Sequence, residues 1–536
     1  MRGEASSWDW PHHILWEDFS AMFGPFENEM LTDFGESDSQ EAMRKALLAA
    51  EKAFGRSYPL LIGGRPETGH GEIHSLDPSD GRTVVGRVAK ASKADVDRAV
   101  GKAWEAFGPW SATGAEARAR IMMRAASIMR RRRLELDAWE VFEAGKPWPE
   151  ADGDVAEAID FLEYYAREAV RLGQGVPVHR IAGEDDQAFY QPLGAGAIIP
   201  PWNFPLAILT GMTSAAIVAG NTVLLKPASA TPVIGAKFME VMEEAGLPPG
   251  VIQFVPGDGG EIGDAIVTHP QIRFVSFTGS RDVGLRINRL AATHQVGQRW
   301  IKRVVAEMGG KDAILADETA DTNALVEGIV ASAFGFQGQK CSACSRAVLV
   351  DSIYDEVARR VAEKTQALVI GHPKDRKNDT GPVITAEAQK KIQGYIDAAR
   401  ADATMLAGEG SVPAEGYFIR PTIFGDVDRH SPLAQEEVFG PVLAMIRAKD
   451  FEEGLEIVND TEYGLTGSFY SNRRDRIEHC RQHFAVGNLY INRKCTGAMV
   501  GAHPFGGFNL SGTDSKTGSP EYLLHFMQMK SVAEKL

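Results

Sequence analysis

Short apolar runs alternate with amphipathic helical patterns through the centre of the chain. GAGAII (194–199) and NTVLLKPA (221–228) predict buried strands, because each run is short and bounded by turn residues. TPVIGAKFMEVMEEAG (231–246) predicts a helix with a Thr-Pro start and a glycine stop. Strands at VIQFVPG (251–257) and IRFVSFTGS (272–280), each followed by a helix, continue the alternation. This pattern predicts a parallel, doubly wound α/β sheet that binds ligands at the strand carboxyl ends.

A second alternating region follows nearer the C-terminus. AVLVD (347–351), PVLAMIRA (441–448) and GNLYINR (487–493) predict strands, and residues 353–368 have helical spacing. The chain has 536 residues, more than one hydrophobic core usually absorbs. We therefore expect two large α/β domains.

Other segments lack this alternation. The residues before about position 35 are rich in Trp and His without any period, and we expect them to lie outside the main fold. QGVPVHRIAGEDDQAFYQPLG (174–194) predicts an extended hairpin, and the tail EYLLHFMQMKSVAEKL (521–536) is half apolar. Segments of the latter kind often pair across a subunit interface, so we expect a homo-oligomer, either a dimer or a multiple of dimers.

Composition narrows the possible partners. The chain carries 57 basic and 72 acidic side chains, a formal charge of −15, which argues against a nucleic-acid or anionic-membrane surface. No stretch approaches the roughly 18 apolar residues of a membrane helix, and the N-terminus has no secretory pattern. Four cysteines form no disulfide framework in so long a chain, so we expect a cytoplasmic protein.

Two of the cysteines stand three positions apart in FQGQKCSACSR (336–346). A zinc site needs four ligands, and Cys480 and Cys495 form no second C-x-x-C pair, so we expect no metal. A redox dithiol would need its own small βαβ setting. The residues alone leave two interpretations open: Cys341 is a nucleophile, or Cys341 and Cys344 are buried and inert.

The setting of Cys341 supports the first interpretation. Gly338 permits a tight backbone, Lys340 supplies positive charge, and the small residues Ser342 and Ala343 leave room for a substrate. A free thiol has a pKa near 8.5, so only about a few per cent of it is thiolate at neutral pH. A nearby cation would raise that fraction.

Two further polar residues follow apolar runs. In VVAEMGGKD, Glu307 precedes two glycines that let the backbone bend sharply; the alternative is a solvated carboxylate at a strand end. In IIPPWNFPLA, Asn203 lies on a stiff loop after a buried strand, which directs its amide outward; the alternative is a turn-forming asparagine. Each signal alone leaves both alternatives open.

Six short motifs occur together in one order. PWNFP, KPA, FTGS, EMGGK, FGFQGQKC and EEVFGPV have the order and spacing of the aldehyde dehydrogenase superfamily, and the resemblance covers the chain from about residue 50 to the C-terminus. It implies an aldehyde dehydrogenase-like α/β fold of two doubly wound parallel-sheet domains with a small oligomerisation hairpin and tail. The implied parts are an N-terminal extension (1–35), a dinucleotide-binding domain (36–173 and 194–305), oligomerisation segments (174–193 and 514–536) and a catalytic domain (306–513).

By this resemblance, Cys341 is the nucleophile that attacks an aldehyde carbonyl to form a thiohemiacetal. The Asn203 side-chain amide and the Cys341 backbone N–H stabilise the oxyanion. Hydride transfer to a nicotinamide ring leaves a thioester, and Glu307 is the general base for the water that hydrolyses it. A glutamate at this position favours hydrolysis to a free acid over acyl transfer to coenzyme A.

The resemblance also implies a dinucleotide site. A G-x-G-x-x-G motif is absent from the expected strand–helix junction, but FTGSRDVG closes a strand and opens a helix that can meet a pyrophosphate. Ser229 stands where strongly NAD-restricted relatives often have a glutamate, so we expect NAD as main cofactor and leave NADP use open. The implied cofactor-binding residues are Pro201, Trp202, Lys226, Ser229, Gly279, Ser280, Gly284, Glu437 and Phe439.

Longer stretches resemble one branch of the superfamily, the 1-pyrroline-5-carboxylate dehydrogenases. They include DVAEAIDFLEYYAREA, RVVAEMGGKDA and VGNLYINRKCTGAMVGAHPFGGFNLSGT. The branch implies oxidation of L-glutamate γ-semialdehyde to L-glutamate in proline degradation, with a proline dehydrogenase as the partner that supplies the substrate. Binding this zwitterion requires donors for its carboxylate. The implied substrate-binding residues are Glu143, which is expected to hold Lys340, and Lys340, Ser342, Gly497, Ala498 and Phe505.

Three alternatives stay open. Another carboxylate-bearing semialdehyde, such as succinate semialdehyde, is compatible with the superfamily motifs. A non-catalytic structural protein that kept only the fold is disfavoured by the joint presence of Asn203, Glu307 and Cys341. A thiol–disulfide oxidoreductase would need Cys344 as its second thiol, whereas the resemblance makes Cys344 a bystander.

Overall fold

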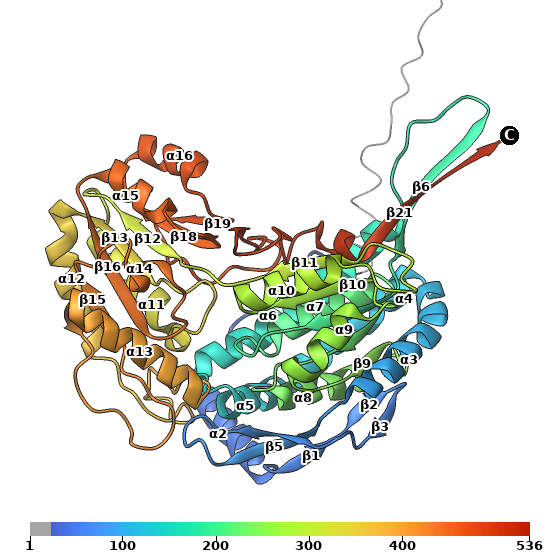
Figure 1. Cartoon of the computed structure of the whole chain (residues 1–536), viewed down its shortest axis with the longest axis horizontal. Coiled ribbons are helices and arrows are strands. Elements are labelled where there is room, and N and C mark those ends of the chain that lie inside the picture. Colours follow the sequence, from blue (N-terminus) through green and yellow to red (C-terminus); the bar gives the residue numbers. More distant parts are fainter. Residues whose placement is uncertain (1–22) are drawn as a thin grey trace, which may run out of the picture.

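Two α/β bodies lie side by side, and a narrow ribbon projects from one of them (Figure 1). The computed structural model describes residues 23–536. Each body contains a seven-stranded sheet, and the ribbon pairs two strands that are far apart in sequence. The predicted α/β class with two doubly wound sheets is confirmed.

The first sheet has the strand order β11-β10-β7-β8-β9-β2-β3. Five strands are parallel, and β2 and β3 add an antiparallel edge. The strands are β2 (Leu60–Ile62), β3 (Arg65–Glu67), β7 (Ala195–Ile199), β8 (Thr222–Leu225), β9 (Ile252–Phe254), β10 (Phe274–Thr278) and β11 (Arg303–Glu307). The four predicted central strands form β7 to β10, and parallel pairing brings their carboxyl ends to one edge.

Both faces of this sheet are buried. Leu224 packs with α3, α9 and α10 on one face, and its neighbours Val223 and Leu225 pack with α4 to α8 on the other. Burial on both faces explains why these strands are almost continuously apolar. The helices of this body are α2 (Ser37–Lys52), α3 (Lys93–Ala112), α4 (Ala115–Arg131), α5 (Arg133–Glu143), α6 (Trp148–Gly173), α7 (Ala207–Val218), α8 (Pro232–Glu244), α9 (Asp264–Thr268) and α10 (Arg281–Ala292). A small sheet joins β1 (Arg56–Tyr58), β4 (Glu72–Leu76) and β5 (Val84–Ala89).

The second sheet has the order β14-β15-β16-β13-β12-β18-β19, with β14 alone antiparallel. Helices α11 and α12 pack on one face, and α13 to α16 pack on the other. The strands are β12 (Ala313–Ala316), β13 (Arg346–Val350), β14 (Thr404–Ala407), β15 (Thr422–Gly425), β16 (Val442–Ala448), β18 (Thr466–Tyr470) and β19 (Asn488–Ile491). The helices are α11 (Thr322–Phe334), α12 (Asp351–Gln366), α13 (Ala386–Asp402), α14 (Pro432–Gln435), α15 (Phe451–Asn459) and α16 (Arg474–His483).

The projecting ribbon consists of β6 (Glu184–Pro192) and β21 (Met527–Lys535), paired antiparallel along their whole length (Figure 1). It occupies part of the predicted oligomerisation segments. The earlier part of the predicted tail lies elsewhere: Tyr522 and Phe526 are buried in the core of the first body, and Ser515 contacts Glu307. The predicted domain boundary at 305/306 also differs from the structure, because it falls inside β11.

The segment before α2 packs against the first body. The Asn28 side-chain amide donates to Asp160 at 2.8 Å, and the Thr32 backbone N–H donates to Asp152 at 2.7 Å, so both contacts are made with α6. Phe34 is buried against the Trp148 ring. The expectation that residues up to 35 lie outside the main fold is therefore wrong for 23–35, and residues 1–22 lie outside the described residues.

Candidate active site

Three segments meet near the carboxyl edge of the first sheet. Asn203 lies in the loop after β7, Glu307 is the last residue of β11, and Cys341 lies in the turn before β13. The Asn203 amide donates to the Gln339 carbonyl at 3.0 Å, which ties the first loop to the segment that precedes Cys341. The negative charge of Glu307 is one of those that act on the Cys341 thiol. The structure thus brings the three predicted catalytic residues together.

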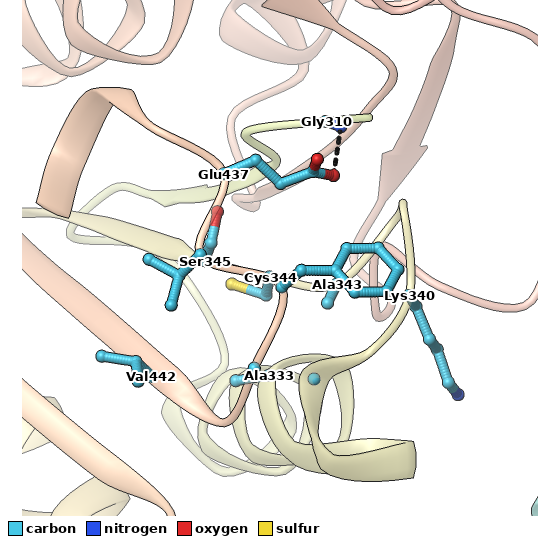
Figure 2. Close-up of a pocket in the computed structure, with 12 residues that line it drawn as sticks. Gly310, Ala333, Lys340, Ala343, Cys344, Ser345, Glu437 and Val442 are labelled. Carbon is cyan, nitrogen blue, oxygen red and sulfur yellow. Dashed lines mark hydrogen bonds between the residues drawn. The ribbon is translucent and has the colours of Figure 1, made fainter. Parts of the chain in front are cut away.

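A glycine pair after β11 permits this close approach. A Cβ added to Gly310 would lie 2.4 Å from the Cys341 carbonyl oxygen, and one added to Gly309 would lie 2.2 Å from the Glu437 carboxylate. The Gly310 backbone N–H donates to Glu437 at 3.0 Å (Figure 2). Any side chain at either position would push the carboxylate of Glu437 or the Cys341 turn away from β11.

The backbone leading to Cys341 has an unusual conformation. Phe336, Gln337 and Gly338 have φ values of +48°, +56° and +66°, in the left-handed region that non-glycine residues rarely adopt. The buried Gln337 side chain holds this run by donating to the carbonyl of Gly145 at 2.9 Å and to that of Pro382 at 2.7 Å. Strain of this kind persists only where surrounding contacts enforce it, as they do here.

The Cys341 thiol is kept protonated by its surroundings. Burial raises its pKa, and the charges of Asp312, Glu437 and Glu307 raise it further. The expectation that Lys340 would promote ionisation is wrong, because its ammonium forms an ion pair with Glu150 at 2.7 Å. In Figure 2 the Lys340 side chain extends away from the Glu437 carboxylate. The thiol therefore needs a base to accept its proton.

Glu307 has the properties of such a base. Burial raises its pKa to about 7, although a hydrogen bond from Ser515 acts in the opposite direction. One carboxylate oxygen accepts from the Ser515 hydroxyl, and Oε2 has no hydrogen-bond partner among the described residues. A pKa near the operating pH suits a group that both accepts and returns protons.

Cys344 has a different environment. Its thiol is buried and donates to the Arg346 carbonyl at 3.4 Å, and it is hydrogen-bonded to Cys495. Figure 2 shows it beside the pocket lined by Gly310 and Glu437. Its partner thiol is thus Cys495, which the sequence did not indicate.

Two of the implied cofactor residues follow β8. Lys226 is buried, and burial lowers the pKa of its ammonium to about 8 against the opposing charge of Asp258. Its contact within the described residues is a long one of 3.4 Å to the Pro227 carbonyl, which leaves the ammonium able to bind a ribose hydroxyl. Ser229 is exposed and donates to the Gly257 carbonyl at 3.2 Å, so no carboxylate stands there to repel a 2′-phosphate.

The junction between β10 and α10 suits a pyrophosphate. Ser280 is exposed at the N-cap of α10, and its side chain makes no cap hydrogen bond. Gly279 and Gly284 both lie where a Cβ would collide, with the Phe277 ring at 2.6 Å and the Met308 sulfur at 2.4 Å. These glycines let the start of α10 lie close to the sheet edge.

Aromatic residues complete the implied cofactor site. Trp202, which follows Pro201 in the loop after β7, meets the Phe439 ring edge-on with 5.6 Å between ring centroids. Phe439 has a positive φ of 60°, two residues after Glu437. Together with the start of α10, these residues would hold a dinucleotide.

The implied substrate loop lies beside the nucleophile. The Cys495 thiol donates to the Ser342 carbonyl at 3.5 Å, which fixes the start of the loop that carries Gly497 and Ala498. Ser342 itself is buried. Phe505 is half-buried, and the next residue of that loop, Gly506, comes within 3.2 Å of Glu307 when a Cβ is added.

Glu143 does not belong to this site. It is fully buried at the end of α5 and accepts from Ser75 Oγ at 2.7 Å and from the backbone N–H groups of Val233 and Ile234 at 2.7 and 2.8 Å. It therefore caps the N-terminus of α8. The expectation that Glu143 binds substrate or holds Lys340 is wrong, because the partner of Lys340 is Glu150.

Glu157 is a functional candidate that the sequence reasoning missed. It is half-buried on α6, and burial, followed by the charges of Asp154 and Asp160, raises its pKa to about 8. It is also one of the carboxylates whose charge acts on Cys341. Acidic residues at 150, 154 and 157 have helical spacing on α6, and that spacing was the available signal.

A half-buried thiol, an amide directed to its turn and a carboxylate with a pKa near neutrality lie beside a candidate dinucleotide site. These are the parts of an NAD(P)-dependent oxidation through a cysteine. Comparison with known proteins agrees, because a model of the aldehyde dehydrogenase family matches residues 65–532. The chain belongs to the aldehyde dehydrogenase family.

Three known proteins are similar to nearly the whole of this chain. The chain is 54% identical over 513 residues to the 1-pyrroline-5-carboxylate dehydrogenase of Geobacillus kaustophilus, covering 96% of this chain and 100% of that protein. It superposes on a Thermus 1-pyrroline-5-carboxylate dehydrogenase with bound NAD at a TM-score of 0.95, with 50% identity over 96% of this chain and 100% of that one. A proline utilization A structure from Bdellovibrio bacteriovorus gives 0.94 and 44% identity over 95% of this chain and 53% of that longer protein.

Residues 23–536 contain neither a candidate membrane helix nor a candidate metal cluster. No helix in this range is both long and apolar enough to cross a membrane. No group of three or more His, Cys, Asp or Glu side chains in the same range is arranged to hold a metal ion.

Proposed function

We propose that the protein oxidises L-glutamate γ-semialdehyde, the open form of 1-pyrroline-5-carboxylate, to L-glutamate with NAD. The observation that carries this proposal is the joint placement of Asn203, Glu307 and Cys341 in a chain 54% identical over its length to a protein with this name. Without that similarity, these three residues would indicate only the oxidation of some aldehyde.

The reaction begins at Cys341. Because the thiol is protonated near neutral pH, its proton passes to the Glu307 carboxylate as the sulfur attacks the aldehyde carbon. The carbonyl oxygen becomes an oxyanion that accepts from the Asn203 amide and the Cys341 backbone N–H. The Gln339 carbonyl holds the amide in place beforehand, so little reorganisation is needed.

Oxidation and hydrolysis follow. NAD supplies the hydride acceptor, held by Lys226, Glu437 and the start of α10. Loss of hydride from the tetrahedral carbon leaves a thioester on Cys341. Glu307 first releases the Cys341 proton to solvent. It then removes a proton from the attacking water and returns it to the sulfur, so that the thiol leaves as the free acid forms.

The substrate carries both an α-carboxylate and an α-ammonium group. Backbone N–H groups of the loop around Gly497 and Ala498, together with Ser342, are the donors we assign to the carboxylate, and Phe505 packs on the aliphatic stem. Glu157 is the carboxylate that we assign to the ammonium, because it is half-buried on α6 and its charge acts on the Cys341 thiol. The raised pKa of Glu157 falls when a cation binds beside it.

Steady-state kinetics with 1-pyrroline-5-carboxylate and NAD test the proposal. We expect the highest kcat/KM with this pair, a lower but measurable value with NADP, and a lower value with succinate semialdehyde. A higher kcat/KM for succinate semialdehyde would overturn the substrate assignment while leaving the aldehyde dehydrogenase activity standing.

Glu157→Gln tests the ammonium contact. Loss of a charge-assisted hydrogen bond costs about 1.5–3 kcal/mol, so we expect kcat/KM for glutamate semialdehyde to fall about 10- to 100-fold. Succinate semialdehyde lacks the ammonium and serves as the internal control, with kcat/KM within about twofold of the wild-type value. An equal loss for both substrates would contradict a role in ammonium recognition.

Asn203→Ala tests the oxyanion site. Removing one preorganised donor typically lowers kcat by about 10²–10³-fold, and we expect a loss in this range with the Kd for NAD unchanged. The matched control is Asn221→Ala, a buried amide that donates to Ala216 and Phe526 carbonyls away from the site and acts on stability alone. A kcat within threefold of wild type in Asn203→Ala would exclude the assignment.

We further propose a homo-oligomer assembled through the β6–β21 ribbon, on which Met529 and Val532 are 52% and 37% exposed. Sedimentation of a variant lacking 527–536 tests this.

A proline dehydrogenase is the enzyme that would supply the substrate, and the match to part of a longer proline utilization A chain supports that link. The four cysteines are free thiols, which supports a cytoplasmic setting.

A further inference from the structure

Lys146 is a fully buried lysine between α5 and α6 that the reaction described above does not use. Its ammonium pairs with Glu140 at 2.9 Å and with Asp154. Burial alone would lower the pKa of Lys146, but the charges of Asp154 and Glu140 raise it above its ordinary value. The side chain is therefore a buried, ion-paired cation.

Two aromatic rings face this cation. The ammonium lies 4.6 Å from the centroid of the Phe204 ring and 5.1 Å from that of the Phe336 ring. Phe204 directly follows Asn203, and Phe336 begins the left-handed run that leads to Cys341. Cation–π contacts are stronger in a desolvated setting such as this one than at an exposed site. Lys146 thus contacts both the loop of the oxyanion amide and the segment of the nucleophile.

Hydrogen bonds reinforce the same two connections. Asp154, the partner of Lys146, accepts from the backbone N–H of Ala207 in the first turn of α7, just after the Asn203 loop. The carbonyl of Gly145, the preceding residue, accepts from the Gln337 side chain. Both loops are therefore anchored around Lys146, one through Asp154 on α6 and the other through Gly145 in the junction between α5 and α6.

We propose that Lys146 is a positioning residue, whose ammonium holds the Asn203 amide and the Cys341 thiol in register for the attack on the carbonyl. This inference rests on the proposed function, because it assigns no chemistry of its own. A buried ion cluster often contributes little stability relative to an apolar replacement of similar volume. A displacement of about 1 Å at a reacting group, by contrast, can cost about 10²-fold in rate.

Lys146→Met is the variant that tests the proposal, and Lys237→Met is its matched control. Lys237 is also a buried lysine, lies 5.3 and 5.0 Å from the Tyr58 and Trp139 ring centroids, and pairs with Glu240 on α8. We expect Lys146→Met to lower kcat about 10- to 100-fold with KM for NAD within twofold of wild type. Lys237→Met should keep both constants within twofold, with a comparable shift in Tm.

Two readouts separate positioning from a purely structural role. Hydrolysis of p-nitrophenyl acetate without dinucleotide reports attack by the Cys341 thiol supported by the oxyanion donors, and we expect the same 10- to 100-fold loss in folded Lys146→Met. Alkylation by iodoacetamide, which needs no oxyanion, should change less than threefold. Ester hydrolysis within threefold of wild type in Lys146→Met would overturn the proposal, whatever the change in Tm.

A second pair of variants covers a failure of Lys146→Met to fold. Phe204→Leu and Phe336→Leu leave the cation in place and remove its aromatic contacts, and each should lower kcat about 10-fold at unchanged KM for NAD. Wild-type rates in both would overturn the proposal. If wild-type protein hydrolyses the ester but does not oxidise 1-pyrroline-5-carboxylate, the proposed function fails while the positioning role is still measured by the ester assay.

Discussion

Replacing Cys341 by alanine is expected to lower kcat for aldehyde oxidation by at least about 10⁴-fold, because the covalent intermediate can no longer form. No other thiol in the chain can take over. Cys344 and Cys480 are buried with raised pKa values, and Cys495 is hydrogen-bonded within the same interior cluster as Cys344. The measurement is single-turnover NADH formation followed by absorbance.

Cys344→Ala is the control for this variant. Its thiol bonds to Cys495 and to a carbonyl, so we expect kcat within about threefold of wild type and a modest loss of stability. If Cys344→Ala abolished turnover as completely as Cys341→Ala, the two thiols would act as a dithiol and the aldehyde mechanism would be wrong.

Glu307→Gln is expected to lower steady-state kcat by about 10³-fold, within the range for loss of a general base. Glutamine keeps the shape of the side chain but accepts no proton. Attack by Cys341 should slow because its proton has lost this acceptor, and the thioester that does form should persist because hydrolysis has lost its base. Mass spectrometry of the protein quenched after one turnover should find the acyl group attached. Absence of that adduct, with kcat equally reduced, would place the function of Glu307 before acylation only.

The pH dependence provides a second measure of Glu307. A carboxyl group with a pKa of about 7 is a base only when deprotonated, so wild-type kcat should fall as the pH drops below about 7. The Ser515 hydroxyl lowers this pKa by its hydrogen bond. Ser515→Ala should therefore shift the low-pH decrease in kcat to higher pH. A decrease at the same pH as in the wild type would show that another group titrates.

Much of this architecture could be predicted from local pattern. The apolar runs that became β7 to β10 are short, bounded by turn residues and followed by helices, and a parallel sheet buried on both faces leaves few other arrangements. Asn203 and Glu307 each end such a run, so their convergence at one edge followed from the predicted sheet.

The wrong expectations concern contacts set by chain reversals. Glu143 and Glu150 are seven residues apart, which would place them on one face of a continuous helix. Gly145, with a φ of +70°, breaks the helix between them, so Glu143 caps α8 while Glu150 holds Lys340. The segment 23–35 was misjudged for a different reason: it packs on α6 through single aromatic rings and hydrogen bonds, which leave no periodic signature.

The glycine pair at 309 and 310 has an evolutionary consequence. Close backbone packing at Gly309 and Gly310 sets the distances to Glu437 and to the Cys341 turn. Residues larger than glycine at these two positions would therefore disturb the reaction centre. New substrate preferences must then arise in the loop beside it, where half-buried Ala498 can change without disturbing that spacing. A fixed backbone at residues 309 and 310, combined with a variable loop around residue 498, lets one oxidation chemistry act on different aldehydes.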